Sequence, residues 1–166
     1  MHWLIIASAT VAAIVMLGGL FLVATANRLD RLHVRMDAGW AALDATLARR
    51  AVVARTIAAG ALDGDRAACL RQAADTAEAA PRMERESAEN ELTRLLAAVD
   101  PDRLPPRLAD ELADAEHRMV IARRVHNDAV RDTLALRRRR KVRYFKLAGT
   151  APQPEYFDIA EPEISS

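Results

Sequence analysis

The chain has 166 residues, and its 24 Lys and Arg side chains are nearly balanced by 23 Asp and Glu, which gives a formal net charge of +1 at pH 7. This balance excludes a general electrostatic attraction to nucleic acid, which is therefore not an expected partner. Aromatic residues make up only 4% of the chain, and Ala and Arg are abundant. Such a composition favours helices over strands and predicts an all-α protein.

The first predicted element is an apolar segment, residues 3–26, without a charged side chain. As a helix it would be roughly 36 Å long, enough to cross a bilayer core of about 30 Å. Ala24-Thr25-Ala26 is similar to a signal-peptidase site. However, no Lys or Arg precedes the segment, and it exceeds the roughly 7–15 apolar residues of a signal core. We therefore predict an uncleaved, single-pass transmembrane anchor over residues 1–26, in the cell membrane.

The charges beside the anchor predict its orientation. Arg28, Arg31 and Arg35 follow it closely, so the positive-inside rule places the body of the protein in the cytoplasm. Within the anchor, small residues four positions apart, such as Ser8 and Ala12, are typical of paired membrane helices. They favour a homo-oligomer.

A helical bundle is predicted over residues 27–146, after the anchor. Apolar residues recur every three or four positions and predict that the anchor continues as one helix to about Ala59, with Gly60 as C-cap; they are Leu29, Leu32, Met36, Trp40, Leu43 and Leu47. A second helical region starts near Asp63 or Asp65 and reaches Val99. Pro81 in its middle either kinks one long helix or separates two short ones.

The last predicted helix runs from Pro106 to Arg140 and carries the most regular stripe in the chain, with alternating spacings of four and three from Leu108 to Leu136. Its polar members are His126 and Thr133. The three helical regions have similar lengths, and no Gly or polar turn residue accompanies Pro81. We therefore favour an antiparallel bundle of three long helices over one of four. An extended, Pro-containing tail over residues 147–166 follows, and Tyr156, Phe157 and Ile159 are its candidates for docking on the bundle.

A basic run is the sharpest charge feature; it consists of Arg137, Arg138, Arg139, Arg140, Lys141, Arg143 and Lys146. Three interpretations remain open. The run is a solvated helix end whose cations complement the helix dipole, a contact for an acidic partner or RNA, or a contact for anionic lipid. Lipid contact requires the last helix to run toward the membrane, which follows only if the region around Pro81 forms two helices.

No motif indicates catalysis or a bound cofactor. The chain has no Gly-rich phosphate loop, no nucleophile elbow and no Cys-x-x-Cys, and the single Cys69 is expected to be a small, buried, unreactive apolar residue. Asp114-Ala-Glu-His117 is the nearest approach to a di-iron motif, with the wrong acid and no second copy, so no metal is expected. Four polar residues on or beside the buried stripes are expected to form hydrogen bonds between helices; they are Glu89, Asn90, Glu116 and Asn127. A carboxylate hydrolase site at Glu89 and Glu116 is the weaker alternative.

Taken together, residues 27–50, 89–93, 111–116 and 121–130 resemble the LemA family of bacterial membrane proteins. The matching positions are Trp40, Arg49, Arg50, Glu89, Asn90, Glu116 and Asn127. Three departures mark a divergent, actinobacterial-type branch: the proline break after the double Arg is missing, His126 stands in place of Tyr, and the basic run replaces Phe-Pro. The resemblance implies an anchored antiparallel bundle that serves as a scaffold or interaction module without catalytic activity.

The expected partners are therefore the lipid bilayer and an unidentified protein. The alternative function is a membrane-surface sensor that binds anionic lipid or an acidic partner through residues 137–146.

Overall fold

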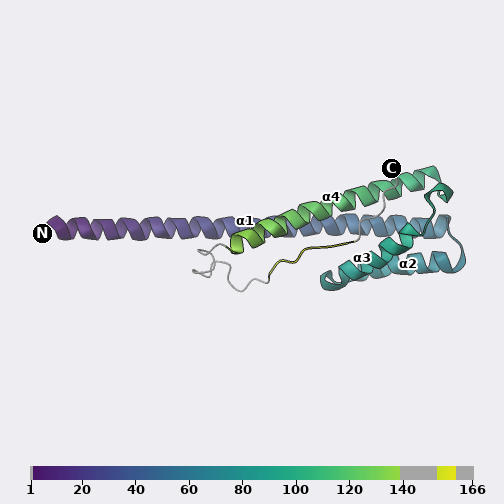
Figure 1. Ribbon diagram of the computed structural model, residues 1–166, viewed down its shortest axis with the longest axis horizontal. Coiled ribbons are helices and arrows are strands. Elements are labelled where there is room, and N and C mark those ends of the chain that lie inside the picture. Colours follow the sequence, from purple (N-terminus) through teal and green to yellow (C-terminus); the bar gives the residue numbers. More distant parts are fainter. Residues whose placement is uncertain (1, 139–152, 160–166) are drawn as a thin grey trace. The chain divides into compact units, whose positions relative to one another are not determined.

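The computed structural model describes residues 2–138 and 153–159. These residues form four α-helices and one short 3-10 helix, with no strand (Figure 1). The elements in chain order are α1 (His2–Gly60), α2 (Gly64–Ala79), α3 (Arg82–Ala97), η1 (Pro101–Arg103) and α4 (Pro106–Arg137). The prediction of an all-α protein is confirmed for the described residues.

The chain divides into two compact units, each of which includes part of α1 and part of α4. Unit 1 comprises Met1–Asp37 with Ala129–Glu155, and unit 2 comprises Ala38–Asp128 with Tyr156–Ser166. Each unit is described by itself.

The core of unit 2 forms where the apolar stripe of α1 meets the other three helices. Leu43, Leu47 and Ile57 are fully buried and recur at helical spacing, as the sequence predicted. The larger cluster joins the end of α1 to α2, α3 and the start of α4, and includes Ala54, Leu70, Ala74, Leu92 and Ala115. The small side chains of Ala54, Ala74 and Ala115 let the helices approach closely.

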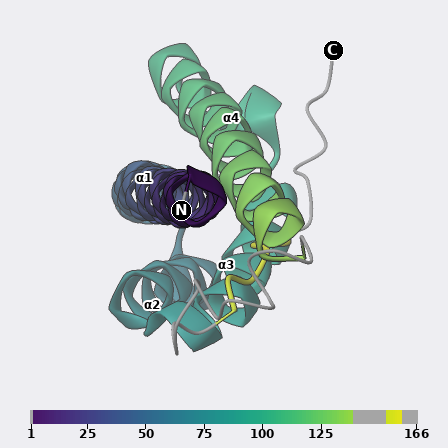
Figure 2. The same ribbon diagram turned by 90° about the vertical axis from the view of Figure 1, so that its left-hand side faces the viewer.

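The prediction of three long helices is wrong, because α2 and α3 are separate helices that form an antiparallel hairpin (Figures 1 and 2). Ala80 and Pro81 are both extended, with φ/ψ of −64°/133° and −65°/159°. The Pro ring fixes its own φ and pushes the preceding residue out of the helical region. Two consecutive extended residues therefore reverse the chain without the glycine that we expected such a turn to need.

Gly39 lies at a close approach of α1 and α4 within unit 2. A Cβ atom built on Gly39 would lie 3.4 Å from the Cα atom of His126 on α4. Glycine within a helix costs about 1 kcal/mol relative to alanine. The close approach to the α4 backbone is the packing reason for a glycine at this position.

In unit 1, the last turns of α4 pack beside the part of α1 that follows the apolar segment. Leu136 and Leu29 are buried together, with Leu32 packed against them. Arg35 and Asp132 form an exposed ion pair at 3.8 Å on the same pair of helices. The C-terminal end of α4 therefore lies next to the residues that directly follow the apolar segment, as expected for four helices and not for three.

The most apolar part of α1 is not buried within the described residues. α1 is the one described helix that is long and apolar enough to cross a membrane, and none of its most apolar window is buried. Trp3 is 85% exposed and Leu17 is 65% exposed.

We predict that Gly39→Leu lowers the free energy of unfolding by about 1–3 kcal/mol, because a large side chain must displace the α4 backbone. Ala38→Leu is the matched control, since Ala38 is exposed on the same helix turn. Denaturant unfolding of the detergent-solubilised chain, followed by far-UV circular dichroism, measures both variants. Equal stability of the two would show that α1 and α4 do not approach closely at Gly39.

Candidate functional site

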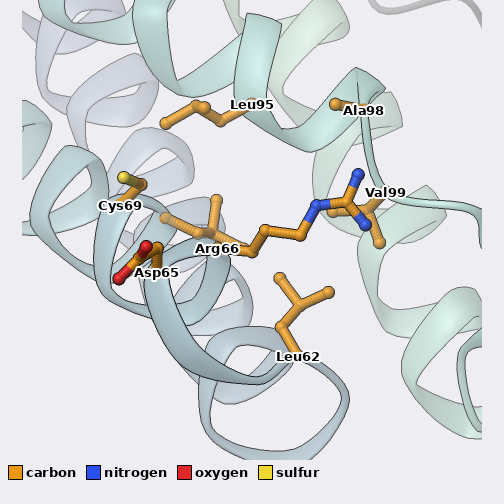
Figure 3. Close-up of a pocket in the computed structure, with 8 residues that line it drawn as sticks. Leu62, Asp65, Arg66, Cys69, Leu95, Ala98 and Val99 are labelled. Atoms are coloured by element: carbon orange, nitrogen blue, oxygen red, sulfur yellow. The ribbon is translucent and has the colours of Figure 1, made fainter.

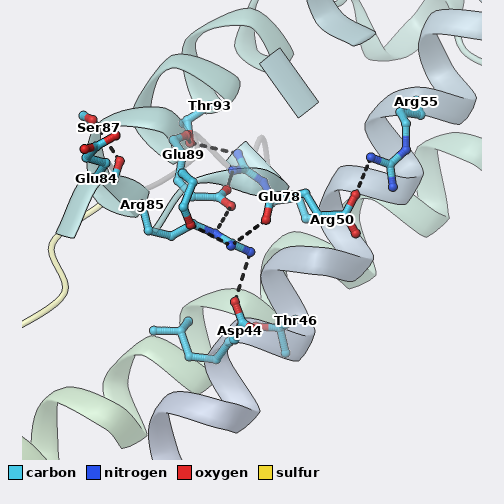
Figure 4. A network of polar contacts seen from close by, with 12 residues as sticks. Asp44, Thr46, Arg50, Arg55, Glu78, Glu84, Arg85, Ser87, Glu89 and Thr93 are labelled. Carbon is cyan, nitrogen blue, oxygen red and sulfur yellow. Dashed lines mark hydrogen bonds and ion pairs between the residues drawn. The ribbon is translucent and has the colours of Figure 1, made fainter. Parts of the chain in front are cut away.

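A buried cluster of charged side chains lies in unit 2, and Arg50 on α1 and Glu89 on α3 are its fully buried members (Figure 4). The Arg50 guanidinium group lies 3.3 Å from a carboxylate oxygen of Glu89 and donates a hydrogen bond of 2.9 Å to the Thr93 hydroxyl. It also lies 3.7 Å from Glu116 on α4. One side chain of α1 therefore contacts polar groups on both α3 and α4.

Arg85 extends the cluster to α2 and closes the turn at Pro81. Its Nε lies 3.3 Å from Glu89, and another guanidinium nitrogen lies 3.1 Å from Asp44 on α1. The third nitrogen donates to the backbone carbonyls of Glu78, at 3.0 Å, and Ala80, at 3.5 Å. The last carbonyls of a helix lack helical partners, so Arg85 from the first turn of α3 caps the end of α2.

Burial dominates the electrostatics of the two inner carboxylates. Desolvation raises the pKa of Glu89 above its ordinary value, and Arg50 and Arg85 oppose this rise only in part. Desolvation likewise raises the pKa of Glu116, against the attraction of Arg50. The charged cluster is therefore stable only while the helices hold cations and anions together.

Trp40 on α1 is at the centre of a second cluster of side chains, which is aromatic. Its ring meets His126 of α4 and Phe157 of the tail edge to face, with centroid separations of 5.6 and 5.5 Å. The guanidinium carbon of Arg82, at the start of α3, lies 4.2 Å from the Trp40 ring centroid, within cation–π distance. Trp40 thus contacts α3, α4 and the tail.

Residues 156–159 of the tail dock as an extended segment in a groove that we call the tail groove. Its walls are formed by α1, α3 and α4, and it consists of Trp40, Leu43, Leu47, Glu86, Met119, Arg123 and Asn127. Phe157 and Ile159 are 4% and 2% exposed, whereas Tyr156 and Asp158 are 50% and 87% exposed. This alternation is that of a β-strand with one buried face.

Side chains of the groove also bind the backbone of the docked segment. The Asn127 amide donates to the Phe157 carbonyl and accepts from the Phe157 N–H, both at 2.9 Å. Glu86 accepts a hydrogen bond of 3.2 Å from the Asp158 N–H. Arg123 lies 3.3 Å from the Asp158 carboxylate and donates to the Ile159 carbonyl at 3.5 Å. Burial of the Phe157 and Ile159 side chains contributes roughly 1.5–3 kcal/mol each to docking.

The residues singled out from the sequence have different positions. Arg50, Glu89 and Glu116 lie in the charged cluster, and Trp40 and Asn127 lie in the tail groove. Arg49 is exposed and Asn90 is half-buried. Of the basic run, Arg137 and Arg138 are described; Arg139, Arg140, Lys141, Arg143 and Lys146 lie outside the described residues.

Sequence reasoning missed Arg85 and Thr93 in the charged cluster. Both are buried, as is Glu89 between them. The available signal was the α3 stripe: positions 85, 89, 92 and 96 follow helical spacing, so two charged residues occupy positions where apolar residues are expected. Docking of the tail through Phe157 and Ile159 was expected, but its recognition by Asn127 was not.

An apolar pocket of about 210 Å³ lies between α2 and α3, near Cys69 (Figure 3). Leu62, Leu95 and Val99 surround the side chain of Arg66 there. Cys69 is exposed, not buried as expected. Among the described residues, no group of three or more His, Cys, Asp and Glu side chains is arranged to hold a metal ion.

Comparison with known proteins yields no relative: no family model, no curated protein and no solved structure matches the chain.

We predict that Glu89→Ala lowers the free energy of unfolding by about 3–5 kcal/mol, because it leaves two buried guanidinium groups without their shared carboxylate. Glu91→Ala is the matched control on α3: its ion pair with Arg94 is exposed, so little change is expected. Denaturant unfolding of the full chain in detergent compares them. A Glu89→Ala variant as stable as the control would contradict the cluster.

Proposed function

We propose that the chain is a single-pass membrane protein whose helical bundle presents a binding surface to a partner protein at the membrane, without catalytic activity. The observation that carries the proposal is the exposure of the apolar part of α1. Exposed side chains from Trp3 to Val23 include Leu, Ile, Val, Met and Phe on all sides of the helix. A helix that is apolar all round and exposed is stable in lipid rather than in water.

The resemblance to the LemA family supports the same proposal. Two of the shared positions, Arg50 and Glu89, are fully buried in the charged cluster, and Glu116 lies beside them. The Asn127 amide binds the backbone of Phe157. These residues act in packing and peptide contact, which suits an interaction module better than a hydrolase.

We expect the full chain to stay in the membrane fraction after alkaline carbonate extraction, and Leu17→Arg with Val15→Arg to weaken this retention. Charges at the centre of a spanning segment oppose insertion by about 2.5–3.5 kcal/mol each. Val52→Arg with Thr56→Arg is the control, since both residues are exposed on α1 beyond the apolar segment. Full release of the unaltered chain by carbonate would contradict the proposal.

The single cysteine allows a test of which side of the membrane the body of the protein lies on, in intact cells that express the chain. With the body in the cytoplasm, a membrane-impermeant maleimide labels the exposed Cys69 only after permeabilisation. Cys69→Ser with His2→Cys moves the thiol to the other side of the anchor, and we expect it to be labelled in intact cells. The reverse pattern would place the body outside.

A second candidate function is contact with anionic lipid through the basic run. The observation that favours it lies in unit 1, where Leu136 packs against Leu29 and Leu32. Leu29 follows the apolar segment by three residues, roughly 4.5 Å along the helix. Arg137 and Arg138 come directly after Leu136, so they lie close to the level at which α1 leaves the bilayer in this proposal. Lys and Arg near an anionic surface contribute about 1 kcal/mol each.

We predict that anionic lipid slows amide hydrogen exchange at the C-terminal end of α4 and in the residue after it, residues 133–138. Vesicles of phosphatidylcholine alone and with added phosphatidylglycerol provide the comparison, and high salt should remove the difference. Arg137→Gln with Arg138→Gln should reduce the effect. Arg103→Gln with Arg107→Gln is the control, because both side chains are exposed and lie in unit 2. Equal exchange in both vesicles would exclude the lipid contact.

A further inference from the structure

The tail groove recognises its occupant in a way that does not depend on covalent connection. Three side chains from two helices bind the backbone of residues 157–159: Glu86 of α3, and Arg123 and Asn127 of α4. Any extended peptide offers the same N–H and C=O groups in the same register. The backbone contacts therefore supply affinity for an extended segment of any origin.

Side-chain selectivity comes from two buried positions and one exposed position. The first buried position meets the edge-to-face ring of Trp40 and suits an aromatic residue. The second, two residues later, is occupied by Ile159 and shares the apolar cluster of Leu43, Leu47 and Met119. Between them, Arg123 faces an acidic side chain that is 87% exposed, so the preference for an acid is weaker.

We propose that the tail groove is a recognition site for an extended peptide of aromatic–acidic–aliphatic type on a partner protein, and that residues 156–159 are a competing ligand supplied by the chain itself. The proposal rests on the interaction module proposed above and names the chemistry of its partner. The docked segment has no regular secondary structure, and only alternate side chains are buried. Hydrogen bonds to its backbone and the burial of alternate side chains hold the segment, as they would hold a separate bound peptide.

The link between α4 and the docked segment allows competition. Residues 139–152 lie between Arg138 and the docked segment in the sequence, and that many residues can span at most roughly 46 Å. Because the tail belongs to the same chain as the groove, its docking is intramolecular, and linked segments reach effective concentrations of about 1 mM. A partner peptide must therefore exceed the tail in affinity or in local concentration, and membrane anchoring of both proteins would raise the latter.

The test uses the full chain in detergent with Trp3→Phe, which leaves Trp40 as the single tryptophan and thus a fluorescent reporter in the groove. Phe157→Ala with Ile159→Ala vacates the groove. The probe is a synthetic peptide of residues 153–162, and the control peptide has Ala at the Phe157 and Ile159 positions. We expect the probe to bind the vacated chain at least about tenfold more tightly than the control peptide does, from the two lost apolar side chains.

Two further comparisons identify the site. The chain with its own tail intact should bind the probe at least about tenfold more weakly, because the tethered tail competes. Asn127→Leu in the vacated chain should abolish binding, whereas Arg124→Gln, an exposed change on the same helix, should not. Equal binding of probe and control peptide by a folded, vacated chain would overturn the proposal.

A second variant covers the case in which the vacated chain does not fold. A protease site placed at residues 147–151 leaves Phe157 and Ile159 unchanged, and cleavage frees the tail as a peptide. We expect the cleaved tail to dissociate on dilution and to be replaced by labelled probe, with helicity unchanged. A tail that stays bound, or a bundle that unfolds on its release, would show that the tail is a fixed part of the core.

Light scattering measures the oligomeric state of the chain in detergent, which tests whether the groove is filled by the tail of a second copy. A dimer that dissociates when Phe157 and Ile159 become Ala would overturn the proposal in favour of tail exchange. Failure of peptide binding leaves membrane association unaffected, because carbonate extraction tests that property separately.

Discussion

The buried guanidinium group of Arg50 is the constraint on which the bundle depends. Its side chain has no exposed surface, and a buried cation requires anions within the protein. Those anions come from α3 and α4, through Glu89 and Glu116. Because Glu89 also binds Arg85, which caps α2, the helical elements of unit 2 are connected through one carboxylate. A shift of any helix by one turn would leave a charge unpaired.

This cluster contributes more to specificity than to stability. The two ion pairs of Arg50 are 3.3 and 3.7 Å long, and Arg50 Nε is buried with no hydrogen-bond partner among the described residues. The raised pKa values of Glu89 and Glu116 show that desolvation outweighs the attraction of the guanidinium groups. An apolar cluster of similar volume would be as stable or more so. We interpret the charges as fixing which helix faces meet in a core that is otherwise rich in small Ala side chains.

Helical periodicity accounts for what the sequence predicted well. The stripes of α1 and α4 are long and regular, and Leu29, Leu43, Leu47, Met119 and Leu136 are all buried. The reversal at Ala80 and Pro81 was missed because its stabilising group is a side chain four residues beyond Pro81. Turn prediction relies on Gly, Asn and Asp, and here an Arg caps the preceding helix instead. The tail groove was out of reach because it joins residues far apart along the chain, such as Asn127 and Phe157, 30 positions apart, and Glu86 and Asp158, 72 positions apart.

The turn at Pro81 and the docked tail are stabilised by the same kind of interaction, but they differ in how easily they can open. In both, a polar side chain satisfies backbone groups that no regular element satisfies. Arg85 is buried in the charged cluster, so the turn at Pro81 opens only if the cluster breaks. Asn127 binds the tail beside exposed Tyr156 and Asp158, and no hydrogen bond or ion pair joins the tail to the Arg50 cluster among the described residues. The tail is therefore the part of unit 2 that can leave while the helices keep their register, which is what exchange for a partner peptide requires.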